Sequence, residues 1–332
     1  MDTALSADDE LLGAFAPSGA RGHRLDRIVH DDLAASLDHV SAAIDAGPPG
    51  WEAVAEALSP ARARLTEGAR LAPVAFGLYY QLVSAIYGGR PEEALEAAEA
   101  LSAAPGAPLG YTIDRRGADP LFDRVLDARM GEEAETFAPI DPAAEAPFAA
   151  LLSEGMDLMA RTVPDLHDEL GGILSQIVLA QSPPDSKIEF DGASHFQFWG
   201  MVLLNPKHHP TPLAVVEVLA HETGHALLFG LTRDEPLVLN PDDELFSSPL
   251  RRDPRPMDGI YHATFVSARM AWTMERLAES DLISADERDR VRKAAAQDRE
   301  NFVKGLGTVR EHGRLTATGQ RILAGAEAAM NG

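Results

Sequence analysis

Two histidines and a glutamate lie within five residues in the segment His221-Glu222-Thr223-Gly224-His225. Histidines four residues apart point to the same face of an α-helix, one turn from each other. Two neutral imidazoles placed in this way can bind one cation at about 2.0–2.1 Å each. Glu222 lies about 100° around such a helix from His221, so it can approach metal-bound water but is poorly placed as a ligand. The segment therefore predicts a divalent-metal site, with Glu222 as the candidate catalytic residue.

The chain contains no cysteine among its 332 residues. This excludes disulfides, cysteine-ligated iron–sulfur clusters and a thiolate nucleophile. A metal therefore has to be held by histidine, carboxylate and water, which narrows the choice to zinc, iron(II), manganese and similar ions.

A third ligand has to come from outside the motif. His262 is the first candidate because it lies near the start of the next predicted long helix. Glu275, further along that helix, and His195, just before a predicted strand, are the alternatives. With a carboxylate as third ligand, the site would be the two-histidine, one-carboxylate triad of iron(II) oxygenases.

The motif is predicted to lie on an apolar helix that runs from Pro212 to about Phe229. Thr211 is a typical N-cap, proline is favoured at the first helical position, and Gly230 is typical of the residue just past a helix end. Burying two imidazoles and a carboxylate in such a helix without partners would cost several kcal/mol. A bound metal would account for their presence.

Helices are predicted to dominate the remaining chain. Up to residue 150 they are joined by turns rich in proline and glycine, including a helix over 91–103 and a loop over 105–120. Further helices are predicted over 148–160, 165–181, 258–280, 285–304 and 316–330, with a long loop over 232–256. Two strands are predicted over 187–190 and 196–205; Gly200 in the second indicates a bulge or a close backbone approach.

These patterns predict a mainly α fold with a small antiparallel β-sheet. The strand before the motif helix and the ligand-bearing helix after it resemble the zincin arrangement. We expect residues 1–150 to form a helical N-terminal region, a candidate for peptide recognition, and residues 151–332 to form the metal-binding catalytic domain. His208 and His209 flank prolines in a predicted turn, so we expect both to be exposed.

The formal net charge is −23. Such an acidic chain repels phosphate backbones and anionic lipid surfaces, so we expect neither nucleic acid nor a membrane as a partner. The first ten residues lack the basic and apolar pattern of a signal peptide, and no apolar run approaches the ~18 residues of a membrane span. We therefore expect a cytoplasmic protein.

Three segments together resemble a known enzyme family. They are residues 218–228 (VLAHETGHALL), 248–259 (SPLRRDPRPMDG) and 260–269 (IYHATFVSAR), and the upstream Phe198-Trp199-Gly200 adds to the likeness. Their order resembles the HExxH-type peptide β-hydroxylases, which are 2-oxoglutarate-dependent, non-haem iron enzymes found beside ribosomally made peptide natural products. The specific part of the resemblance covers roughly residues 185–280.

The resemblance implies iron(II) held by His221, His225 and a third residue, for which His262 is the first candidate. It implies 2-oxoglutarate chelating the iron and O₂ as the oxidant. Hydroxylation would fall on the β-carbon of a residue in a precursor peptide. Glu222 would then orient a ligand or water rather than act as a base.

A 2-oxoglutarate enzyme also needs a cation for the distal carboxylate of that molecule. Arginine is the usual solution because its planar fork binds a carboxylate through two hydrogen bonds. Arg255 is our first candidate, followed by Arg251 in the same loop and Arg269, seven residues past His262. Each could instead form a structural ion pair with a nearby carboxylate.

Two other functions stay open at this point. In a zinc metallopeptidase Glu222 would be the general base, and zinc would lower the pKa of the attacking water. Against this, no Gly-x-x-His extension follows His225. The third possibility is a non-catalytic peptide-binding protein with a structural metal.

Overall fold

The structure, a computed structural model, describes residue 11 and residues 13–45, 50–186, 189–233, 235–251 and 253–331. Helices account for 67% of it, which confirms the prediction of a mainly α fold. Within those ranges no helix combines the length and the apolar character that crossing a membrane requires.

The chain forms two compact units, and neither is continuous in sequence. Unit 1 comprises the described residues of Met1–Leu25, Ala150–Gly172 and His209–Gly332, and unit 2 comprises those of Asp26–Ala149 and Ile173–His208. One of the breaks lies between Ala149 and Ala150. The first part of the chain contributes to unit 1, and residues 173–208 return to unit 2.

Unit 2 combines helices with a four-stranded sheet. Its helices are α3 (Glu52–Thr66), α4 (Pro73–Tyr87), α5 (Pro91–Ala103), α6 (Pro120–Met130) and the short η1 (Gly131–Thr136), η2 (Pro142–Ala144) and η3 (Pro206–His208). Its strands are β1 (Thr112–Arg115), β2 (Gln176–Leu179), β3 (Gly192–Ser194) and β4 (Met201–Leu204). The helix over Pro91–Ala103 has the predicted bounds, with proline at its first position and two glutamates in its first turn.

The predicted antiparallel sheet is wrong in its topology. The strand order is β1-β2-β4-β3; β1, β2 and β4 are parallel, and only the edge strand β3 is antiparallel to its neighbour. Parallel strands need a long crossover, and the helices between residues 115 and 176 supply it. The only other antiparallel pair of strands in the described ranges is formed by β5 (Leu245–Phe246) and β6 (Arg255–Pro256), each of which has two residues.

The predicted strand over 196–205 is shorter in the structure, where only Met201–Leu204 pairs. Gly200 ends the preceding turn at a φ of 82°, and a Cβ there would lie 2.8 Å from Ser175 Oγ. Its carbonyl accepts a hydrogen bond from the Ser175 backbone at 2.8 Å, which confirms the close backbone approach. The other predicted strand, over 187–190, falls partly on Lys187 and Ile188, which lie outside the described residues; Glu189 and Phe190 are not in a strand.

Unit 1 contains the motif helix. Its elements are α8 (Pro164–Ile173, of which Ile173 belongs to unit 2), α9 (Pro212–Leu231), β5, β6, α10 (Met257–Glu279), α11 (Ala285–His312) and α12 (Ala317–Asn331). The helices α2 (Gly19–Asp45) and α7 (Glu145–Thr162) pass from one unit into the other. The cap of α9 is the predicted one, because Thr211 Oγ1 accepts a hydrogen bond from Ala214 N at 3.2 Å.

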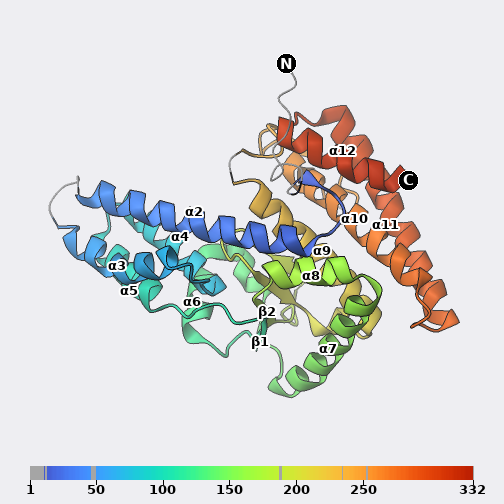
Figure 1. Ribbon diagram of the computed structural model, residues 1–332, viewed down its shortest axis with the longest axis horizontal. Coiled ribbons are helices and arrows are strands. Elements are labelled where there is room, and N and C mark those ends of the chain that lie inside the picture. The colour runs from blue at the N-terminus through green and yellow to red at the C-terminus, as the bar shows by residue number, and fades with distance from the viewer. Residues whose placement is uncertain are drawn as a thin grey trace. The chain divides into compact units, whose positions relative to one another are not determined.

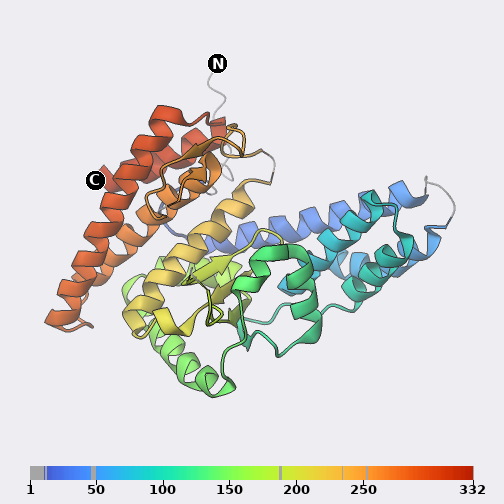
Figure 2. The same cartoon turned by 180° about the vertical axis from the view of Figure 1, so that it is seen from behind.

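The helix α10 is the central element of unit 1. It runs beside α11 in both views of the ribbon, where the two are coloured orange (Figure 1) and are seen again from behind (Figure 2). A Cβ on Gly305 of α11 would lie 2.2 Å from Thr264 Oγ1 of α10, so only glycine permits this approach. Most of α10 is buried, which fixes the orientation of the side chains that it presents to α9.

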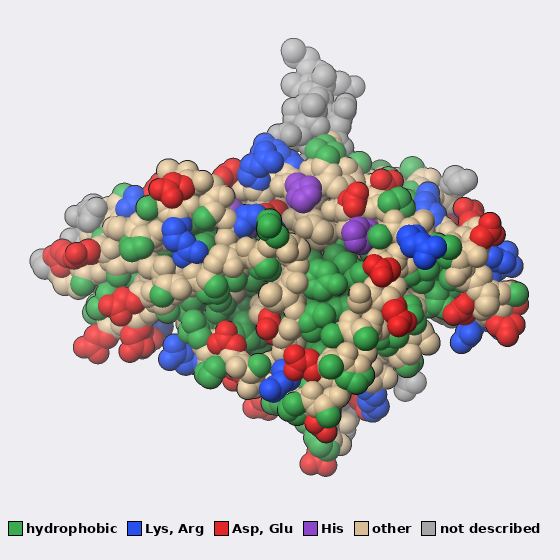
Figure 3. Space-filling model, turned by 60° about the horizontal axis from the view of Figure 1, so that its bottom comes forward, with side chains coloured by type: hydrophobic (Ala, Val, Ile, Leu, Met, Phe, Trp, Pro, Cys, Tyr) green, Lys and Arg blue, Asp and Glu red, His purple; other side chains and the backbone are tan. Residues whose placement is uncertain are grey.

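Acidic and basic side chains are both scattered across the face drawn in Figure 3, with hydrophobic side chains between them. No large basic patch is seen on that face.

Candidate metal site

The three predicted histidine ligands lie together. Nε2 of His225 is 3.1 Å from Nε2 of His221 on the same helix, and Nδ1 of His225 is 3.0 Å from Nδ1 of His262 on α10. Phe229, one turn after His225, lies against His262 with ring centroids 5.3 Å apart. The helices α9 and α10 therefore bring together three imidazoles from two distant parts of the sequence.

All three imidazoles have lowered pKa values. Burial, with smaller effects of the Arg251 and His209 charges, lowers the pKa of His221 to about 4. Burial and the charges of His221, His262 and Arg251 hold the pKa of His225 well below its usual value. Burial also lowers the pKa of His262, against an opposing effect of Asp258. Neutral imidazole is the form that binds a metal.

The donor chemistry of this histidine triad fits a divalent metal, but the ring orientations do not yet converge. Nitrogen ligands about 2.1 Å from one ion lie about 3.0–3.4 Å apart at angles of roughly 90–109°. The Nε2 pair of His221 and His225 meets this condition, whereas His225 faces His262 with its other nitrogen. Accordingly, no group of three His, Asp or Glu side chains within the described ranges is arranged to hold a metal as it stands. One ion can contact all three only if a ring rotates.

Glu222 is buried beside the histidines. Its side chain is 3% exposed, and Oε1 lies 3.9 Å from Nε2 of His221. This is beyond direct hydrogen-bonding distance but within reach of a shared water. Glu222 is therefore close enough to His221 to act on a water molecule beside that imidazole.

The three candidate arginines differ in their surroundings. Arg251 is exposed, and its charge contributes to the lowered pKa values of both His221 and His225. Arg255 forms an ion pair with Asp253 at 2.8 Å. Arg269 is fully buried and is bound to Glu169. Of the two loop arginines, Arg251 is the one whose charge acts on both motif histidines.

The alternative third ligands have other partners. Glu275 accepts a hydrogen bond from Arg299 Nε at 2.9 Å on the outer part of α10. His195 belongs to unit 2, where its ring stacks on Phe196 with centroids 4.8 Å apart and accepts from Gln197 N. His262 is the candidate that the structure brings to His225.

His209 is buried, and the prediction of an exposed residue is wrong. It is 5% exposed, and its charge acts on His221. His209 comes two residues before the N-cap Thr211, so the start of the motif helix carries it into the core of unit 1. Its flanking prolines indicated a turn but carried no signal of burial. His208, in unit 2, is partly buried and pairs with Glu189 at 2.9 Å.

Comparison with models of known protein families gives no match, and comparison with curated proteins gives none either.

Proposed function

We propose that this chain is an iron(II)- and 2-oxoglutarate-dependent oxygenase that hydroxylates the β-carbon of a residue in a ribosomally made precursor peptide. The observation that carries the proposal is the contact of His262 with His225, because it brings a third imidazole next to the two histidines of the HExxH helix. The family resemblance of residues 185–280 supplies the chemistry.

Each residue near the triad has a separate task in this proposal. His221, His225 and His262 would hold iron(II), which together with 2-oxoglutarate supplies the oxidation of a C–H bond by O₂. Arg251 would bind the distal carboxylate of 2-oxoglutarate, since its guanidinium is exposed, its charge acts on both motif histidines, and guanidinium matches carboxylate geometry. Glu222 orients a water or a ligand from its buried position.

The order of elements along the chain supports a zincin-like arrangement. Three parallel strands and an antiparallel edge strand precede the HExxH helix α9, and the next helix, α10, carries the third histidine. This order is compatible with both a hydroxylase and a peptidase, so it adds nothing to the choice between them.

The test is turnover with the full chain, iron(II), 2-oxoglutarate and a panel of precursor peptides. We expect succinate to form and the peptide to gain one oxygen atom. His225→Ala should lose both products, whereas His167→Ala, a partly exposed histidine of unit 1 that pairs with Asp168, should keep them. Succinate formation that is equal in wild type and His225→Ala would contradict the proposal.

A zinc metallopeptidase is the second candidate, and the placement of Glu222 3.9 Å from His221 Nε2 favours it equally. There Glu222 would take the proton of the attacking water. Glu222→Gln separates the two functions. A peptidase would lose cleavage of test peptides, whereas the oxygenase has no cleavage to lose and should retain its metal.

A further inference from the structure

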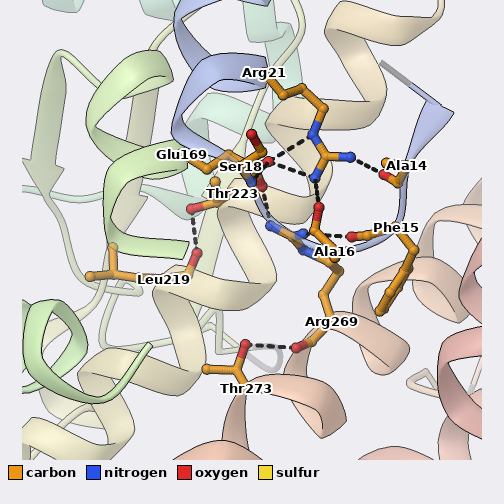
Figure 4. A network of polar contacts seen from close by, with 10 residues as sticks. All are labelled: Ala14, Phe15, Ala16, Ser18, Arg21, Glu169, Leu219, Thr223, Arg269 and Thr273. Atoms are coloured by element: carbon orange, nitrogen blue, oxygen red, sulfur yellow. Dashed lines mark hydrogen bonds and ion pairs between the residues drawn. The ribbon is translucent and has the colours of Figure 1, made fainter. Parts of the chain in front are cut away.

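A buried charge cluster lies next to the motif helix in unit 1. It consists of Glu169 of α8, Arg21 of α2 and Arg269 of α10, whose side chains are all 0% exposed (Figure 4). Arg21 Nε donates to Glu169 Oε1 at 2.7 Å, and Arg269 Nη2 donates to Oε2. The single carboxylate of Glu169 thus pairs with two guanidinium groups, so the three side chains together carry one net positive charge.

Backbone carbonyls of the N-terminal segment solvate the excess charge. Arg21 donates to the carbonyls of Ala14 and Ala16, and Arg269 Nη1 donates to that of Phe15 at 3.1 Å. Buried charges are tolerated only where hydrogen bonds of this kind replace water. Both arginines therefore pair with the same carboxylate and donate to backbone carbonyls of the same segment, two for Arg21 and one for Arg269, in what we call the Glu169 cluster.

Only Arg269 also contacts the metal motif. A Cβ added to Gly224, between Glu222 and His225, would lie 3.7 Å from Arg269 Cγ and 2.9 Å from Val266 Cγ1. Arg269 comes two helical turns after His262, so both residues belong to the same face of α10. Its stem lies against the motif helix while its head is fixed by Glu169, as the close view shows (Figure 4).

We propose that Arg269 is a positioning residue of the metal site. Its bonds to Glu169 and to the Phe15 carbonyl fix the stem against Gly224, and this sets the placement of α10, and hence of His262, relative to His221 and His225. The inference rests on the proposed function only in taking the three histidines as a metal site. It assigns Arg269 a role other than binding 2-oxoglutarate.

Arg21 provides a matched control. Arg21→Met and Arg269→Met each remove one guanidinium and leave Glu169 paired one-to-one with the other arginine, so both variants keep a neutral buried pair. Methionine retains a flexible apolar stem in each case. A purely structural cluster would respond in the same way to the two substitutions.

The experiment titrates the full chain and both variants with Co(II) and follows its visible absorption, with thermal unfolding measured in parallel. We expect similar losses of thermal stability, but about 10–100-fold weaker Co(II) binding only in Arg269→Met, the range typical for residues that orient ligands. Equal Co(II) affinities of the two variants would overturn the positioning role. Absence of Co(II) binding in the wild type would instead overturn the metal site itself, and this inference with it.

If Arg269→Met does not fold, Arg269→Lys tests the same point. Lysine keeps the stem and the charge but lacks the planar fork that bonds Glu169 and the Phe15 carbonyl together. We expect Co(II) binding weaker than wild type and stronger than that of a triad variant such as His262→Ala. Binding equal to wild type would overturn the proposal.

Discussion

The Nδ1 atoms of His225 and His262 lie 3.0 Å apart, although 37 residues separate them in the sequence. This contact joins the motif helix α9 to the helix that follows the long loop. Because of this contact, we propose the imidazole of His262, rather than a carboxylate, as the third metal ligand.

Removal of His262 should therefore reduce metal binding as strongly as removal of a motif histidine. We expect His221→Ala, His225→Ala and His262→Ala each to lose the bound metal, measured as metal content after reconstitution and desalting, because two remaining ligands hold an ion weakly. His167→Ala should retain it. Full metal content in His262→Ala would remove that residue from the ligand set.

Substitution of Arg251 and substitution of Arg255 should have different effects on the concentration of 2-oxoglutarate that the enzyme requires. We expect Arg251→Ala to raise the concentration of 2-oxoglutarate needed for half-maximal succinate formation by about tenfold or more, the equivalent of a lost charge-assisted pair of ~1.5–3 kcal/mol. Arg255→Ala should change it little, because Arg255 is paired with Asp253. The opposite pattern would return the role to Arg255.

Gly224 is predicted to be intolerant of a side chain. A Cβ there meets Val266 Cγ1 at 2.9 Å, so Gly224→Ala should force α9 and α10 apart and lower the free energy of unfolding by about 1–3 kcal/mol. Gly307→Ala on α11 is the control, since nothing lies within 4 Å of its Cβ, and should raise that free energy by about 0.5–1 kcal/mol. Urea unfolding measures both. A Gly224→Ala variant with a higher free energy of unfolding than wild type would show that α9 and α10 can move apart without loss of stability.

The free energy of unfolding should decrease as the pH rises, because of Asp298 on α11. Burial, helped by the charge of Glu217, raises the pKa of Asp298 to about 8. Its unfolded value is about 3.9, so between about pH 4 and 8 the folded state binds the proton that the unfolded state has lost. The free energy of unfolding therefore decreases with pH across this window, by at most ~1.4 kcal/mol per pH unit from this group.

Asp298→Asn should remove this contribution and be more stable than wild type near the top of the window, with the difference shrinking toward its lower end. Urea unfolding at several pH values measures it. Asp289→Asn, an exposed position on the same helix, is the control and should track wild type. Parallel pH profiles of wild type and Asp298→Asn would contradict an elevated pKa.

Local signals were sufficient to predict the elements that carry the site. Proline at the first helical position and threonine before it defined the start of α9, and the structure has that cap. The next long helix was predicted over 258–280, and α10 covers Met257–Glu279. The spacing of the motif histidines then fixed their common face.

The remaining features depend on contacts between distant residues. The strand β1 has the sequence TIDR, which lacks an apolar alternation, and only its parallel pairing with β2 defines it. Burial of His209 and pairing of Arg269 with Glu169, 100 residues away, likewise follow from tertiary packing. No local pattern at Arg269 distinguishes a buried ion pair from a cofactor ligand.

The most direct test of the central claim is anaerobic reconstitution of the full chain with iron(II) and 2-oxoglutarate, followed by visible absorption. We expect a weak charge-transfer band that needs both components, fades on admission of O₂, and is missing in His225→Ala. The absence of a band in wild type, together with tight zinc binding and cleavage of test peptides, would contradict the oxygenase and make this chain a metallopeptidase.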